Sequence, residues 1–119
     1  MRLTDLDPRW FAAEGRRGQG ITFECPHCVG TPHAVRLSAP FKNPVDGGAP
    51  VSLEARELWP LLWPRPDNAP DRVTVPPGVC WDRTGETFEV LSLLPSIDAS
   101  RSGHWHGFVR LGEIVNAGP

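Results

Sequence analysis

Alternating apolar and polar positions predict two short strands in the first third of the chain. Residues 21–25 and residues 33–37 both alternate with a period of two, which is typical of strands buried on one face only. A loop, 26–32, which contains prolines and a glycine, separates the two runs. The pattern therefore predicts a hairpin. Its core-facing positions are Ile21, Phe23, Cys25, His33, Val35 and Leu37.

Further strands are predicted toward the end of the chain. Residues 86–94 give the strongest strand pattern, and because this run ends apolar on both faces we expect it to be central in a sheet. Residues 104–111 also alternate, which places His104 and His106 on one face and Trp105 on the other. Shorter strands are expected at 72–75 and 114–115.

Helical signals are confined to two short segments. Residues 7–14 are expected to form a helix with Asp7 as its N-cap and Pro8 in its first turn. Residues 51–59, with Ser52 as a cap, predict a second helix. Because the chain carries 14 prolines and 12 glycines, long uninterrupted helices are not expected.

The length of 119 residues indicates one domain, 1–119, with an N-terminal arm at 1–19 and a Pro-rich insertion at 40–80. The predicted fold class is mostly β. We expect a small β-sheet, sandwich-like or zinc-ribbon-like domain with one or two short helices and long Pro-rich loops. A domain of this size has a thin core, so a metal cross-link would stabilise it.

Charge and hydrophobicity narrow the classes of function. The net charge is −2, with acidic and basic residues scattered along the chain, and no polybasic tract indicates nucleic acid or anionic lipid as a partner. No apolar run approaches the roughly 20 residues that span a bilayer. The first residues, 1–7, lack the apolar core of a signal peptide. We therefore expect a cytoplasmic protein, in the host cell cytoplasm if it is phage-encoded.

The motif Cys25-Pro26-His27-Cys28 is the most specific chemical signal in the sequence. Two cysteines three positions apart in an intracellular chain indicate either a metal site or a redox pair. A redox pair normally opens a helix, and the prolines and glycines around this motif argue against one. The motif therefore favours a zinc knuckle, in which backbone N–H groups point at the thiolates.

A second pair of ligands is predicted at His104 and His106. Side chains two positions apart on a strand face the same way, roughly 6.5–7 Å apart along the chain, which is close enough to converge on one ion. The four predicted ligands of a tetrahedral Zn²⁺ are Cys25, Cys28, His104 and His106.

Other residues compete for these roles. His33 follows soon after Cys28 and is an alternative ligand, whereas Cys80 is better explained as a small buried hydrophobe. A catalytic zinc would need an open coordination position and a general base. Four carboxylates could act as that base, and no spacing singles one out. They are Glu24, Asp82, Glu86 and Glu113.

Several sequence blocks resemble a group of small phage and prophage proteins of unknown function. The blocks are Cys25-Pro26-x-Cys28, Trp81 to Glu89, Leu91 to Ile97, and Gly103 to Phe108 followed by Gly112-Glu113. Members of this group often carry the automatic label "ammonia monooxygenase", which denotes a membrane copper enzyme, and this chain has neither a membrane span nor the size for that activity. The resemblance implies a phage or prophage origin and a zinc-bound domain. It offers no catalytic residue.

Three hypotheses of function follow. The first is a non-enzymatic accessory protein with a structural zinc, which binds a host or phage protein through its Trp- and Pro-rich middle. The second is a zinc-dependent hydrolase with an open metal position. The third is a nucleic-acid-binding zinc module, which would need an exposed arginine face around Arg16, Arg17 and Arg36.

Overall fold

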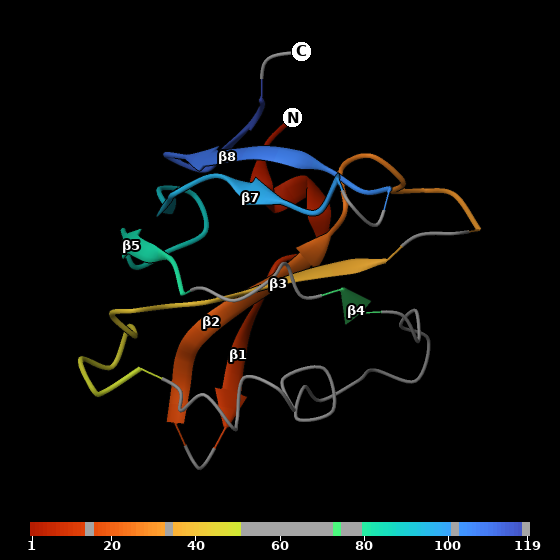
Figure 1. Ribbon diagram of the computed structural model, residues 1–119. Coiled ribbons are helices and arrows are strands. Elements are labelled where there is room, and N and C mark those ends of the chain that lie inside the picture. Colours follow the sequence, from red (N-terminus) through yellow and green to blue (C-terminus); the bar gives the residue numbers. More distant parts are fainter. Residues whose placement is uncertain (14–15, 33–34, 51–72, 75–79, 101–102, 118–119) are drawn as a thin grey trace.

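The structure is a computed structural model that describes residues 1–13, 16–32, 35–50, 73–74, 80–100 and 103–117. In these ranges it contains the short strands β1 to β9, one 3₁₀ helix, η1 (Leu3–Leu6), and no α-helix. The predicted mostly β fold class is therefore confirmed (Figure 1). The helix predicted over 51–59 lies outside the described residues.

The largest sheet has the strand order β1-β2-β3-β4. β1 pairs with β2 and β2 pairs with β3 in antiparallel fashion, whereas β4 joins β3 in parallel. The hairpin predicted in the first third is present as β2 and β3, although β3 covers Arg36–Pro40 and not the predicted 33–37. The strand expected at 72–75 is present as β4. The strands are β1 (Arg9–Ala13), β2 (Arg16–Glu24), β3 (Arg36–Pro40) and β4 (Val73–Thr74).

The register of the hairpin places its apolar residues in the core. Ile21 pairs with Ala39 and Phe23 pairs with Leu37, and all four side chains are fully buried. Cys25, which continues the same face, is also fully buried. The predicted burial of the apolar positions is confirmed where the structure describes them, whereas position 33 lies outside the described residues. The expected exposure of the other face is wrong, because Thr22, Arg36 and Ser38 are buried as well.

The helix predicted at 7–14 is wrong, because Arg9–Ala13 forms β1 and pairs with β2. Asp7 adopts a left-handed backbone conformation (φ 48°), which turns the chain at the expected helix start. Along a strand the two aromatic residues that follow point to opposite sides. Phe11 is fully buried, and Trp10 stacks on Phe88 with ring centroids 4.4 Å apart. Aromatic packing therefore outweighs the local capping signal.

Two smaller sheets complete the fold. One has the strand order β5-β6, and the other has the order β7-β8-β9 with antiparallel pairing throughout. In Figure 1, β7 and β8 lie across the end of the β2–β3 hairpin. The strands are β5 (Asp82–Thr84), β6 (Ser92–Leu94), β7 (Ile97–Asp98), β8 (His106–Arg110) and β9 (Glu113–Asn116).

The strand predicted at 86–94 is correct only at its end, since β6 begins at Ser92 and the preceding residues form the turn from β5. Gly85 starts this turn with a φ of +89°, a conformation that glycine adopts at little cost. The turn carries Leu91 into the core, where it is fully buried and its carbonyl accepts a hydrogen bond from Gly112 N–H (2.8 Å). The apolar run is buried only in part, since Leu91 and Leu93 lie in the core whereas Val90 and Leu94 are exposed. The expectation of a central strand is wrong, because β6 pairs only with β5 in a two-stranded sheet.

The core draws side chains from all three sheets and from η1. The residues buried in it include Leu3, Leu6, Ile21, Phe23, Leu37, Phe41, Trp81, Leu91, Leu93, Ile97, Trp105 and Val109. Backbone hydrogen bonds also link distant segments, such as Leu3 N–H to Gly112 O (2.8 Å) and Trp81 N–H to Pro40 O (2.8 Å). The chain is therefore tied together by packing and by backbone pairing.

The opposite face of the β2–β3 hairpin buries an arginine. Arg36 is 1% exposed and donates hydrogen bonds to the Asp7 carboxylate (3.2 Å) and carbonyl (2.6 Å) and to the Thr22 carbonyl (3.0 Å). Burial, followed by the nearby Arg9 charge, lowers the pKa of Arg36 to about 10, so it remains charged at neutral pH. This network fastens the turn before β1 to the main sheet.

Candidate metal centre

The turn between β2 and β3 presents two thiols from a fixed backbone. Cys25 directly follows β2, and its N–H donates to Val35 O (2.9 Å), which extends the hairpin ladder beyond the strand ends. Cys28 N–H then donates back to Cys25 O (3.2 Å). Thr31 holds the second cysteine from the other side, because its N–H and its hydroxyl both donate to Cys28 O (3.1 and 2.7 Å). The two cysteines of the predicted knuckle therefore lie in one hydrogen-bonded turn.

His104, from the C-terminal part of the chain, lies beside these two thiols. The segment that joins β7 to β8 turns at Gly103 (φ +79°), and His104 N–H donates to Ala99 O (3.1 Å). Figure 1 shows the segment that leads into β8 beside the turn that follows β2. The imidazole Nδ1 of His104 lies 3.9 Å from Cys28 Sγ, although the two residues are 76 positions apart.

The geometry of these three side chains fits a metal ion. One ligand atom each from Cys25, Cys28 and His104 lies within 4.8 Å of the others. A tetrahedral zinc with Zn–S of about 2.3 Å and Zn–N of about 2.0 Å holds a sulfur and a nitrogen about 3.5 Å apart. The measured separation of 3.9 Å is close to this value. The chain therefore contains a candidate Cys₂His metal-binding group.

The surroundings of Cys25 also fit a metal-bound thiolate. Burial raises the pKa of the Cys25 thiol, and the backbone N–H groups of His27 and Trp105, which donate to its sulfur, partly oppose that rise. Without a compensating cation, a buried sulfur would therefore keep its proton. N–H groups aimed at sulfur are typical of the shell around structural metal sites. A cation between the thiols would remove the penalty that burial imposes on the charged form.

The remaining predicted ligands lie elsewhere. His106 is exposed at the start of β8, its Nε2 is 3.3 Å from Ser96 Oγ, and it does not belong to the group. The predicted strand 104–111 is wrong at its start, because β8 begins at His106, and only the first of the two histidines lies with the thiols. Cys80 is buried, as expected, and is also outside the group. His33 lies outside the described residues.

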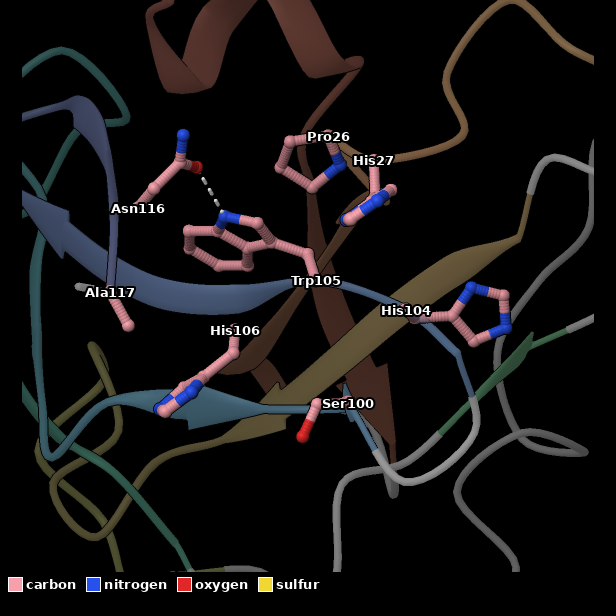
Figure 2. A pocket seen from close by; sticks show the side chains of 8 residues that line it. All are labelled: Pro26, His27, Ser100, His104, Trp105, His106, Asn116 and Ala117. Carbon is pink, nitrogen blue, oxygen red and sulfur yellow. Dashed lines mark hydrogen bonds between the residues drawn. The ribbon is translucent and has the colours of Figure 1, made fainter. Parts of the chain in front are cut away.

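A pocket adjoins the metal group through His104 (Figure 2). Its volume is about 420 Å³. Trp105 stands at its centre in Figure 2, and its indole Nε1–H donates to Asn116 Oδ1 (2.9 Å). The lining residues are Pro26, His27, Ser100, His104, Trp105, His106, Asn116 and Ala117.

Two features of the site were missed in the sequence. Trp105 is buried (3% exposed), and its backbone N–H supports the thiol of Cys25. Gly107 leaves room for the indole, because a Cβ at this position would collide with Trp105 Cζ2 and Val115 O. The run His104-Trp105-His106-Gly107 thus combines a ligand, a buried indole and the space that the indole needs. The signal that could have shown this is a glycine two positions after a tryptophan, next to a predicted strand.

Comparisons with known protein families, with curated proteins and with solved structures found no match. Among the described residues, no helix has the length and apolar character needed to cross a membrane.

Proposed function

We propose that this chain is a zinc-binding accessory protein of phage or prophage origin, in which Cys25, Cys28 and His104 hold a structural Zn²⁺. The observation that carries the proposal is the convergence of two thiols and one imidazole from opposite ends of the chain. Thiolate and imidazole are the ligands that structural zinc prefers in proteins. When bound, the ion would join the β2–β3 turn to the segment before β8.

The proposed action of the protein is to bind a host or phage protein. This part of the proposal comes from the sequence, because the Trp- and Pro-rich middle that would make the contact lies mostly outside the described residues. The competing nucleic-acid hypothesis loses its expected surface. Arg36 is buried against Asp7, and Arg16 is held by Asp46 through two hydrogen bonds of 2.8 Å, so these residues form no continuous basic face.

A zinc-dependent hydrolase is the second candidate. It is favoured by one observation, namely that the described residues supply three ligands and that one of them, His104, also lines a pocket. An open fourth position could then hold a water. However, no carboxylate is among the described residues that line the pocket, so the general base would have to be an imidazole. A structural role therefore has the stronger support.

Metal analysis of the purified protein tests the main proposal. We expect about one zinc per chain in the wild type and in His27→Ala, which changes the same turn without removing a ligand. Cys28→Ser and His104→Ala should both lose most of the metal. A wild type without zinc, or a His104→Ala variant that binds zinc as tightly as the wild type, would overturn the proposal.

The fourth ligand can be identified in the same way. Zinc affinity is measured by competition with a chromophoric chelator for His33→Ala, His106→Ala and Cys80→Ser. A large loss in one variant identifies a closed site and supports the structural role. If none weakens binding, a cobalt-substituted sample whose spectrum responds to added azide would support an open position and the hydrolase.

A further inference from the structure

The loop that follows β3 contains the one Asp-Gly dipeptide in the sequence, Asp46-Gly47. In such a dipeptide the amide nitrogen of the glycine can attack the side-chain carboxyl carbon of the aspartate, because glycine has no Cβ to hinder the approach. The attack forms a bond from this nitrogen to Cγ, releases one water and gives a cyclic succinimide. Water then opens the ring, and opening at the α-carbonyl leaves isoaspartate, in which the main chain runs through Cγ.

The structure holds the electrophile of this reaction in a clamp. Arg16 donates from Nε and from Nη2 to the two carboxylate oxygens of Asp46, each at 2.8 Å. Gly48 N–H also donates to Asp46 Oδ1 (2.9 Å). The hydrogen bonds from Arg16, followed by that from Gly48, hold the pKa of Asp46 well below its usual range, so the group is ionised at neutral pH. An ionised carboxylate resists the attack because one of its oxygens must gain protons before it can leave as water.

The nucleophile is restrained as well. Gly47 N–H donates to Pro44 O (3.0 Å), so the amide nitrogen keeps its hydrogen and is tied to a carbonyl within the loop. For the attack, the Asp46 carboxylate must leave Arg16, and the Gly47 amide must leave Pro44. Both reacting groups are therefore held apart from the reaction while the loop keeps these contacts.

From this arrangement we propose that Asp46-Gly47 is an isoaspartate-forming site that the Arg16 clamp protects in the folded protein. The two ends of the clamp are 30 positions apart, so the protection exists only when folding brings the start of β2 to this loop. Isomerisation would lengthen the main chain by one carbon beside Val45, whose N–H fastens the loop to Gly18 O (2.9 Å). The proposal goes beyond the zinc-binding function and does not depend on it.

The test is to age the full chain at neutral pH and to measure isoaspartate at position 46. Peptide mapping with fragmentation that distinguishes isoaspartate from aspartate gives the rate, and the succinimide is recognised as a species lighter by one water. We expect slow formation in the folded wild type and faster formation in wild type unfolded in guanidinium chloride. Equal rates in the two states would overturn the proposal, because the fold would then give no protection.

Two matched arginine variants show whether Arg16 is responsible. Arg16→Ala removes the clamp and should form isoaspartate about fivefold faster than the folded wild type, a factor that corresponds to the loss of a favourable exposed ion pair. Arg17→Ala removes the exposed arginine next in the chain, leaves the clamp in place and should age like the wild type. A wild-type rate in Arg16→Ala, or equal acceleration in both variants, contradicts the assignment.

A conservative variant separates loss of the clamp from loss of the fold. Arg16→Lys keeps the charge but lacks the planar fork that engages both carboxylate oxygens, so its rate should lie between those of the wild type and Arg16→Ala. Melting temperatures are measured for all variants, and each is aged well below its own. If Arg16→Ala does not fold, Arg16→Lys decides, and a rate no faster than that of the wild type then refutes the protective role of Arg16.

Discussion

Replacing His104 by alanine should remove most of the stability that zinc contributes, even though both thiols remain. The reason is topological. Cys25 and Cys28 lie in one turn, so an ion bound to them alone closes only a very short loop. His104 is 76 positions from Cys28, and its bond to the ion closes a large one. The variant therefore keeps part of the metal site and loses the long-range cross-link.

The magnitude follows from the entropy of loop closure. If the ion acted like a covalent cross-link over 76 positions, it would stabilise the folded state by about 4.5 kcal/mol at 25 °C. Coordination bonds can open, so this value is a ceiling. For a domain of this size, a loss of 1 kcal/mol lowers the melting temperature by roughly 3–6 °C. Complete loss of the cross-link should therefore lower it by at most roughly 13–27 °C.

The assay is thermal unfolding followed by circular dichroism, in a zinc buffer and again with excess chelator. Free zinc must be held constant, because stabilisation by a bound ion depends on its concentration. We expect chelation to lower the melting temperature of the wild type and of His27→Ala by similar large amounts. His104→Ala should start lower and should change by only a few degrees. If chelation destabilises His104→Ala as much as the wild type, the long-range cross-link does not exist.

Three other predictions concern Gly107 beside the candidate metal group and two arginine–aspartate pairs of the main sheet. Gly107→Ala should destabilise the protein by about 1–3 kcal/mol in urea unfolding and should weaken zinc binding, because the added Cβ displaces Trp105. A variant with unchanged stability and unchanged zinc affinity would contradict this prediction. Asp7→Ala should destabilise by about 1–3 kcal/mol because the buried charge of Arg36 loses a partner, and Asp7→Asn should lose less. Hydrogen bonds from Arg16 hold the pKa of Asp46 below its usual range. The stability that this carboxylate contributes is therefore present above about pH 4 and lost as the pH falls further. In acid, the melting temperature of Asp46→Asn should fall less steeply with pH than that of the wild type. Parallel curves of melting temperature against pH for the two proteins would refute the assignment.

The sequence predicts best where a local pattern and the tertiary environment agree. The hairpin of β2 and β3 was predictable because its apolar positions alternate and face the core, as Ile21 and Phe23 show, although the burial of the opposite face could not be foreseen. The helix expected at 7–14 failed because the capping signal of Asp7 is local, whereas the stacking of Trp10 on Phe88 joins segments far apart in the chain. Propensity near a cap is worth too little to outweigh such a contact.

The candidate site was predictable in part for a similar reason. The C-x-x-C spacing is a local signal, and it identified both thiols. The pairing of His104 with His106 depended on where β8 begins, and strand boundaries are set by contacts that no local pattern contains. The support that Trp105 and Gly107 give to the site depends on the fit of an indole against β9, which only the three-dimensional packing shows.

The distance along the chain between the thiols and His104 also has a consequence for biosynthesis. Ribosomes add roughly 5–20 residues per second, so the 76 positions after Cys28 require roughly 4–15 s. An ion that reaches the emerging polypeptide in that interval finds two sulfurs and no imidazole from residue 104. Full coordination of a metal at the candidate site would therefore form late in translation. A product truncated before residue 104 would lack the third ligand, and we expect proteases to remove it faster than the intact chain.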